Sequence, residues 1–154
     1  MVDKKNLPSR YVTDSHGCEG RKGLEGPEGR ALDGFSLIYV SSFEPYKNHL
    51  LLFRAIRQLR EEGMRVRIDL YGDFLTNSAE LASKEMMAMD ARFKEWFVFK
   101  GVVDERLLLL EMQQYDLAIF PSQCEAFGVP ILDALALGVP LVVPSNGAGA
   151  EIAK

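Results

Sequence analysis

Residues 121–140 read PSQCEAFGVPILDALALGVP and decide how this part of the chain folds. Gly128 and Pro130 are typical of a tight loop that leads into a helix, where free backbone N–H groups attract anions. Glu125 lies before this loop. Asp133 lies eight residues after Glu125, in the first turn of the predicted helix. Because carboxylates repel phosphate, the two acids are better suited to bind hydroxyl groups. The stretch therefore predicts a ligand with both phosphate and vicinal hydroxyls, and a nucleotide sugar is such a ligand.

Strand and helix patterns alternate from Phe35 to the end of the chain. The predicted strands span residues 35–40, 66–71, 96–99, 117–120 and 141–143, and the predicted helices span 48–62, 78–93, 104–115, 130–137 and 147–154. This alternation predicts an α/β fold, a Rossmann-like parallel sheet with helices on both faces. We expect the strand order 3-2-1-4-5 and a ligand site beyond the carboxyl ends of the strands.

Three residues mark the ends of these helices. Asn48 and Asp104 can cap the helices at 48–62 and 104–115, because their side chains accept hydrogen bonds from N–H groups that have no partner within the helix. Gly63 is suited to end the first of these helices, since glycine adopts the left-handed conformation without strain.

Residues 1–34 differ from the rest of the chain. They are polar, mixed in charge and rich in glycine, which recurs at every third position from Gly17 to Gly29. So few triplets with so little proline do not make a collagen-like triple helix. We interpret residues 1–34 as a flexible lead or linker and residues 35–154 as one domain.

The composition excludes several classes of protein. A chain of 154 residues with 47% hydrophobic and 26% charged residues is typical of a globular domain. Its net charge of −4 argues against a general nucleic-acid binder. There is no apolar run of the roughly 20 residues needed to cross a bilayer, and the N-terminus lacks the apolar stretch of a signal peptide. Cys18 and Cys124 form no C-x-x-C pair, so we predict neither a disulfide framework nor a zinc site. We predict a cytoplasmic location, where cysteines remain reduced.

Common catalytic and nucleotide-binding motifs are also missing. The sequence has no G-x-x-x-x-G-K-[ST] and no G-x-G-x-x-G after the first predicted strand, which argues against a nicotinamide-dependent dehydrogenase. His49 has no evident acidic or metal-binding partner. Cys124 has no base near it in the sequence, so nucleophilic cysteine chemistry is not predicted.

The stretch quoted above resembles a family signature. Retaining glycosyltransferases of GT-B type, of the large family 4 group (glycosyl transferases group 1), have a similar pattern. The matching residues are Pro121, Ser122, Glu125, Phe127, Gly128, Pro130, Ala134, Gly138, Val139 and Pro140. The resemblance runs from about Phe35 to Lys154. It implies one half of a GT-B fold, the C-terminal nucleotide-sugar-binding domain, cut before its last strand and closing helices.

The resemblance assigns roles to three charged residues. Glu125 matches the first acid of the family's glutamate-x7-glutamate pattern and would face the donor sugar as the catalytic residue. Asp133 matches the second acid, one methylene shorter, and would accept hydrogen bonds from the ribose. Lys47 matches a phosphate-binding lysine. The family commonly has an arginine in the same turn, near the position that Ser42 occupies here.

Five further residues are implied in nucleotide binding. Phe127, Gly128 and Val129 form the loop and helix start next to Glu125, where glycine lets the backbone approach a ligand closely. Lys100 and Gly101 lie in a segment that resembles the one whose backbone borders the base.

The resemblance implies a glycosyltransferase fragment of the hexosyltransferase type. It would supply the donor-binding half for transfer of a sugar, with retention, from a UDP- or GDP-sugar to an unknown acceptor. No metal and no cofactor beyond the donor are implied. Because the acceptor domain is missing, we expect the isolated chain to be inactive, and we expect peripheral membrane association through the missing half. Because the last strand and closing helices are missing, we expect an exposed apolar edge or face, and therefore self-association or low solubility. The alternatives are a non-catalytic nucleotide-sugar-binding module, a partner subunit, or an epimerase or phosphorylase on the same fold.

Overall fold

The computed structural model describes residues 34–73 and 92–153. Its strands are β1 (Phe35–Val40), β2 (Val66–Tyr71), β3 (Phe97–Gly101), β4 (Leu117–Ile119) and β5 (Leu141–Val142). Its helices are the 3-10 helix η3 (Pro45–Lys47), α1 (His49–Glu61), α3 (Phe93–Trp96), α4 (Glu105–Met112), α5 (Val129–Ala136) and α6 (Ala148–Ile152). The predicted lead, apart from its last residue, and the predicted helix at 78–93, apart from its last two residues, lie outside the described residues.

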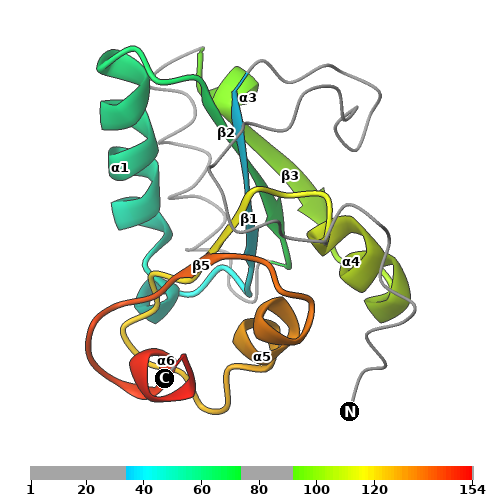
Figure 1. The fold of residues 1–154 in the computed structure, drawn as a ribbon. Coiled ribbons are helices and arrows are strands. Elements are labelled where there is room, and N and C mark those ends of the chain that lie inside the picture. Colours follow the sequence, from blue (N-terminus) through cyan, green and yellow to red (C-terminus); the bar gives the residue numbers. More distant parts are fainter. Residues whose placement is uncertain (1–33, 74–91, 154) are drawn as a thin grey trace, which may run out of the picture.

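The five strands form one parallel sheet with the order β3-β2-β1-β4-β5, as the sequence predicted. Helices cover both faces, with α1 on one side of the sheet and α4 on the other (Figure 1). From β1 the chain moves outward in one direction to β2 and β3, and then returns to the other side of β1 with β4 and β5. The order of connection therefore reverses between β1 and β4, which is where sheets of this kind bind ligands.

The hydrophobic core joins the middle of the sheet to the helices. Leu37, Ile38 and Tyr39 of β1 are all buried, as expected for a parallel strand covered on both faces. At the amino end of β3, the indole of Trp96 is buried, and the guanidinium groups of Arg60 and Arg92 each lie 5.3 Å from its ring centre. The contact from Arg60 ties α1 to α3, whereas Arg92 directly precedes α3.

Two element boundaries differ from the prediction for packing reasons. The third strand begins at Phe97 instead of residue 96, because Trp96 ends α3 with its ring packed against α1. Helix α4 ends at Met112 instead of residue 115. The chain leaves the helix there, and the hydroxyl of Tyr115 is buried against Asp69 of β2 at 2.9 Å. A contact with a distant strand thus sets the helix end.

The predicted caps have mixed outcomes. Asp104 caps α4, since its Oδ1 accepts from the N–H of Arg106 at 2.9 Å. Gly63 follows α1 with a φ of 88°, in agreement with its expected role. The side-chain cap at Asn48 was wrong. Asn48 has a left-handed backbone with φ 62°, and its side chain makes no capping hydrogen bond to α1.

Candidate functional site

The candidate site centres on an ion pair between two loops at the carboxyl ends of β1 and β4. Lys47 ends η3, in the loop after β1, and Glu125 lies in the loop after β4. Lys47 Nζ and Glu125 Oε2 are 2.7 Å apart, and the two side chains are 15% and 11% exposed. The sequence predicted both residues for the site, and the structure adds that they contact one another.

Two hydrogen bonds to backbone carbonyls hold the same two loops together. The N–H of Gln123 donates to the carbonyl of Tyr46 at 2.8 Å. The side-chain amide of Asn48 donates to the carbonyl of Pro121 at 3.2 Å. Asn48 therefore uses its side chain to join the loops instead of capping α1, and the site is assembled from segments that are far apart in the chain.

A third connection comes from inside the sheet. Tyr39, near the end of β1, donates its hydroxyl hydrogen to the carbonyl of Lys47 at 2.6 Å. Its oxygen lies 3.2 Å from the hydroxyl of Ser122, in the other loop. Burial raises the pKa of Tyr39 to about 12, and Glu125 and Tyr46 nearby add to the shift. The hydroxyl is therefore protonated at neutral pH.

The backbone of the first loop is shaped by its residues. Pro45 lies at the start of η3, where its fixed φ and missing N–H are tolerated. Asn48 has the left-handed conformation that separates η3 from α1, and asparagine accepts this conformation better than most residues. Its N–H donates to the carbonyl of Pro45 at 3.1 Å. Lys47 is thus held on a single short turn, with its Nζ 5.5 Å from the ring centre of Tyr46.

The start of α5 forms the other part of the site. Gly128 precedes the helix with φ 68°, and a Cβ there would lie 2.8 Å from Cδ1 of Ile152. Pro130 has no N–H, and Ile131 donates to the carbonyl of Gly128 at 2.9 Å. The N–H of Val129, the first helical residue, is therefore the donor of this turn that has no partner within the helix. Pro130 and Ile131 therefore leave this helix start fewer N–H groups for an anion than a helix start usually offers.

Phe127 and Val129 are placed on the surface at this helix start. Their side chains are 70% and 50% exposed. Both lie next to the loop that holds Glu125. Exposed apolar side chains beside a polar site are suited to pack against a ligand or another part of a larger protein.

Asp133 is displaced from its predicted position. It is the fifth residue of α5, and the first turn of this helix contains no acidic residue. Its pKa is raised by partial burial and, secondarily, by Glu105 at the start of α4. The first-turn prediction was therefore wrong. The charged neighbour that acts on Asp133 belongs to α4 and is not part of the Lys47–Glu125 pair.

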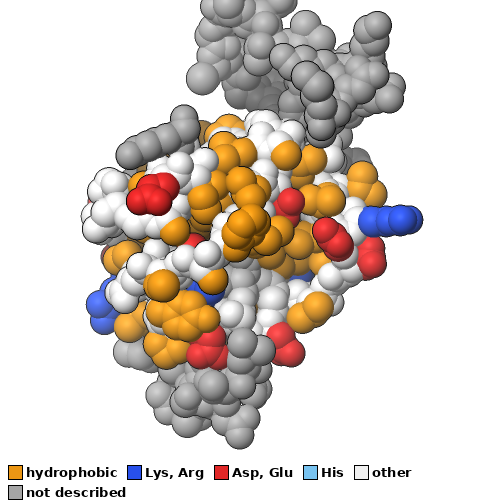
Figure 2. All heavy atoms as spheres, turned by 90° about the horizontal axis from the view of Figure 1, so that it is seen from below, with side chains coloured by type: hydrophobic (Ala, Val, Ile, Leu, Met, Phe, Trp, Pro, Cys, Tyr) orange, Lys and Arg blue, Asp and Glu red, His pale blue; other side chains and the backbone are white. Residues whose placement is uncertain are grey.

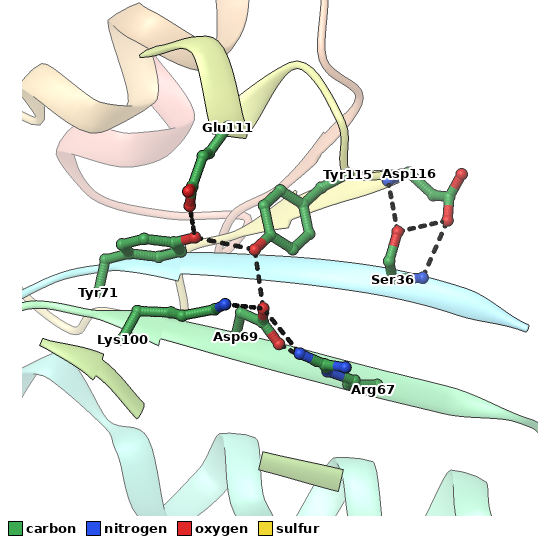
Figure 3. A network of polar contacts seen from close by, with 8 residues as sticks. All are labelled: Ser36, Arg67, Asp69, Tyr71, Lys100, Glu111, Tyr115 and Asp116. Atoms are coloured by element: carbon green, nitrogen blue, oxygen red, sulfur yellow. Dashed lines mark hydrogen bonds and ion pairs between the residues drawn. The ribbon is translucent and has the colours of Figure 1, made fainter. Parts of the chain in front are cut away.

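Lys100 belongs to a buried polar network around Asp69 (Figure 3). Asp69 is 2% exposed, and Lys100 Nζ lies 3.7 Å from its Oδ2. Arg67 donates to both carboxylate oxygens at 2.9 and 3.2 Å, and Tyr115 donates to Oδ2 at 2.9 Å. The side chain of Lys100 is thus engaged within the protein. The carbonyl of Gly101 accepts from the N–H of Gly72 at 2.9 Å.

The network continues from Asp69 to α4. The hydroxyls of Tyr71 and Tyr115 are 3.0 Å apart, and Tyr71 donates to Glu111. Burial raises the pKa of both tyrosines, and the neighbouring acids Glu111 and Asp69 add to this effect. Each tyrosine thus donates its one hydroxyl hydrogen to an acid, and the Tyr71–Glu111 hydrogen bond joins β2 to α4.

A cavity of about 510 Å³ lies beside the two joined loops. Its wall combines residues of α1 and its preceding turn, of β4 and β5, and of the segments that follow these strands, namely Asn48, Leu51, Leu52, Ala55, Ile119, Pro121, Ser122, Gln123, Val142, Val143, Pro144 and Asn146. The polar members come mostly from the loops, whereas α1 and the strands supply apolar groups. Seen from the end where α5 and α6 lie, hydrophobic side chains gather across the centre of the surface, with acidic side chains among them (Figure 2).

Other candidate chemistry finds no support among the described residues. Residues 34–73 and 92–153 contain no group of three or more His, Cys, Asp and Glu side chains arranged to hold a metal ion. No helix in the same ranges is long and apolar enough to cross a membrane. Cys124 is exposed. His49 is buried against Phe43, with 4.1 Å between the ring centres, and its Nε2 has no hydrogen-bond partner.

Sequence reasoning missed three residues that organise the site. Tyr39 and Asn48 join the two loops, and Asp69 holds Lys100. A signal exists for Tyr39 and Asp69, since each places a polar atom within a strand of the predicted sheet, which has helices on both faces. The partners of these atoms could not be found from the sequence, because they lie on other elements.

Comparison with known proteins identifies the family. The family model described as "Glycosyl transferases group 1" matches residues 24–154. Protein CapJ of Staphylococcus aureus is 26% identical over 97% of this chain and 39% of that protein. The O-antigen chain mannosyltransferase B of Escherichia coli is 31% identical over 73% of this chain and 29% of its own length. The chain therefore spans less than half of these relatives.

Solved structures show the same fold. The pneumococcal O-GlcNAc transferase GtfA, solved with UDP and GlcNAc, is 26% identical and superposes with a TM-score of 0.61 over 71% of this chain and 20% of that one. HepE of Anabaena, solved with UDP, is 26% identical with a TM-score of 0.64 over 77% of this chain and 32% of that one. Together with the family model and the parallel sheet, these likenesses show that the chain belongs to the glycosyl transferases group 1 family.

Proposed function

We propose that this chain binds the nucleotide-sugar donor of a retaining glycosyltransferase of the family 4 group. One observation carries the proposal. Lys47 and Glu125 meet at the carboxyl ends of β1 and β4, the two strands between which the order of connection reverses. Ligands of open parallel sheets bind at this position. A cation and an anion side by side suit a donor that has both a diphosphate and sugar hydroxyls.

In this proposal each group of the site has a separate task. Lys47 binds the diphosphate as a point charge, with one further hydrogen bond from the N–H of Val129. Glu125 accepts hydrogen bonds from the donor sugar and is the residue that acts at the reacting sugar. Asp133 accepts from the ribose, and the backbone of Lys100 and Gly101 borders the base.

The ion pair also defines how the site responds to a ligand. Lys47 and Glu125 form an ion pair at 2.7 Å. A diphosphate that approaches Lys47 competes with this carboxylate, and a sugar hydroxyl gives the released carboxylate a new partner. A complete nucleotide sugar therefore satisfies both charges, whereas a free nucleotide satisfies only the lysine. No metal is required by this arrangement.

A thermal-shift panel tests the proposal. UDP, GDP, ADP and their glucose derivatives are each added to the chain, with EDTA present in a second series. We expect UDP or GDP compounds to raise the melting temperature, because a ligand that binds only the folded state stabilises it. EDTA leaves the shift unchanged. If no nucleotide changes the melting temperature at millimolar concentration, the proposal is wrong.

Two substitutions separate the tasks of the ion pair. Lys47→Ala should raise the dissociation constants of both UDP and UDP-glucose about tenfold or more, since a hydrogen bond to a charged group contributes about 1.5–3 kcal/mol. Glu125→Gln should retain or strengthen the binding of UDP, and it should weaken the binding of UDP-glucose relative to that of UDP. Arg57→Ala, on the exposed side of α1, is the control. Calorimetric titration that shows equal losses for both ligands in Glu125→Gln would contradict the assignment of the sugar to this residue.

Sugar transfer itself is proposed for the whole protein. Because the chain spans 39% of CapJ and 29% of the mannosyltransferase, an acceptor-binding part is expected elsewhere. Placing two substrates against one another supplies much of an enzyme's rate. We expect this chain alone to bind the donor without transferring sugar, which a radiolabelled-donor assay with and without an added acceptor domain would measure.

A further inference from the structure

One buried hydroxyl touches both loops of the site without reaching the ligand-binding side chains. Tyr39 Oη lies 2.6 Å from the carbonyl oxygen of Lys47 and 3.2 Å from the hydroxyl of Ser122. Lys47 carries the proposed phosphate contact. Ser122 lies three residues before Glu125, which carries the proposed sugar contact. The tyrosine thus contacts both loops that carry the charged residues.

The direction of these two hydrogen bonds follows from the number of hydrogens. A tyrosine hydroxyl has one hydrogen, and a carbonyl oxygen can only accept. Tyr39 therefore donates to Lys47, and Ser122 donates to Tyr39. The two loops are linked in series, from the Ser122 hydroxyl through the tyrosine oxygen to the backbone of Lys47.

The position of this hydroxyl is fixed by the sheet and not by the loops. Tyr39 belongs to β1 and is 1% exposed. Its ring packs against His49 and Phe120, with centres 4.8 and 6.1 Å away. A rigid side chain from the central strand therefore gives both loops a common reference point, which loop-to-loop contacts alone do not provide.

We propose that Tyr39 is a positioning residue, whose hydroxyl sets the separation of the Lys47 ammonium and the Glu125 carboxylate and so preorganises the site for a nucleoside diphosphate sugar. The part that concerns the ligand rests on the proposed function. The part that concerns the ion pair does not, because Lys47 and Glu125 contact one another directly. The two parts are therefore tested separately.

The first measurement needs no ligand. A double-mutant cycle with Lys47→Ala and Glu125→Ala gives the coupling between the two side chains, measured as the factor by which one substitution changes the effect of the other on the unfolding equilibrium. The cycle is repeated with Tyr39→Phe, which removes only the hydroxyl. We expect the coupling factor to fall towards one. A factor that is the same in both backgrounds overturns the inference.

The second measurement uses UDP as the probe. Tyr39→Phe should raise the dissociation constant of UDP about fivefold, in line with the loss of one hydrogen bond. In a Lys47→Ala background the same substitution should have no further effect on UDP binding, since the tyrosine acts through the lysine. A purely structural role would lower the melting temperature without this dependence on Lys47.

Two more variants sharpen the result. Ser122→Ala removes the other hydroxyl of the series and should also lower the coupling factor. It replaces Tyr39→Phe in the test if Tyr39→Phe does not fold. Ser36→Ala is the control, since its buried hydroxyl, at the opposite end of β1, donates to Asp116 at 2.7 Å and contacts neither loop. An equal loss of coupling in Ser36→Ala contradicts the inference. If the unsubstituted chain binds none of the nucleotides of the thermal-shift panel, the proposed function is wrong, and the cycle measured without ligand still decides the role of Tyr39.

Discussion

At the scale of single residues, His49 makes stability depend on pH. Burial, and secondarily the charge of Lys47, lowers its pKa from 6.5 to about 4. The folded chain therefore keeps His49 neutral, while the unfolded chain takes up a proton below pH 6.5. This contribution to stability is complete above pH 6.5 and is lost as the pH falls towards 4.

We expect His49 to cost about 2 kcal/mol of unfolding free energy between pH 7 and pH 5. Chemical denaturation at the two pH values measures the loss. His49→Phe keeps a ring against Phe43 and removes the titrating group, so the difference between the two proteins cancels other titrations. If both lose the same free energy between pH 7 and pH 5, His49 is not the cause.

The charged residues show what a sequence predicts about a site. Lys47 and Glu125 could be chosen because each follows a recognisable strand and lies in a motif. Their ion pair could not be predicted from the sequence, since it depends on how two distant loops approach one another. Asp133 was placed wrongly because the start of α5 lies one residue earlier than the pattern suggested.

At the scale of elements, the network in Figure 3 fixes α4 to β2. Tyr115→Phe removes the hydroxyl between Asp69 and Tyr71 and leaves a buried carboxylate with one partner fewer. We expect a loss of about 1.5–3 kcal/mol in the free energy of unfolding, the usual contribution of a hydrogen bond to a charged group. Tyr46→Phe, on an exposed ring, should change it by less than about 0.5 kcal/mol. Urea denaturation of both variants checks this, and equal effects would count against the network.

The join between α5 and α6 depends on Gly128. Gly128→Ala puts a side chain at φ 68° and a Cβ 2.8 Å from Ile152, whereas Gly138→Ala has the same φ and no atom within 4 Å. We expect each variant to lose about 1–2 kcal/mol from the backbone conformation, with a further loss in Gly128→Ala alone. Adding Ile152→Val removes the crowded methyl and should restore part of that surplus. Thermal unfolding compares the variants, and equal losses at both glycines would show that the contact is unimportant.

Element boundaries were predictable only where the cause is local. Asp104 and Gly63 act on neighbouring backbone, and both were identified correctly. The end of α4 and the start of β3 are set by Tyr115 and Trp96, which pack against other elements. The position of Asn48 before α1 suggested a cap. Its actual partner, the carbonyl of Pro121, lies in a distant loop and could not be identified from the sequence.

At the scale of the whole molecule, the parallel sheet and its order followed from strand–helix alternation. Strand order needs only the handedness and length of connections, so it is less sensitive to single contacts than the site is. Which surfaces remain open was not predictable in detail. The apolar cavity beside α1, with Leu51 and Val142 about half exposed, is the clearest example.

We expect this cavity to promote self-association of the chain, because exposed apolar surface favours association. Sedimentation velocity over a wide concentration range should show a species larger than the monomer. Leu51→Glu, at the cavity, should shift the distribution to monomer. Leu110→Glu, on the exposed surface of α4 on the other side of the sheet, should not. A monomer at every concentration, or the same shift in both variants, would refute the expectation.

The cation-flanked Trp96 gives the chain an intrinsic optical reporter. It is the only tryptophan in the sequence, and it lies at the amino end of β3, at the opposite end of the sheet from Lys47 and Glu125. Its fluorescence emission should shift to longer wavelength when α1 and α3 separate and water reaches the indole. Nucleotide binding should leave the emission spectrum almost unchanged. Unfolding can therefore be followed by fluorescence at any ligand concentration, with no extrinsic dye and no signal from the binding event itself.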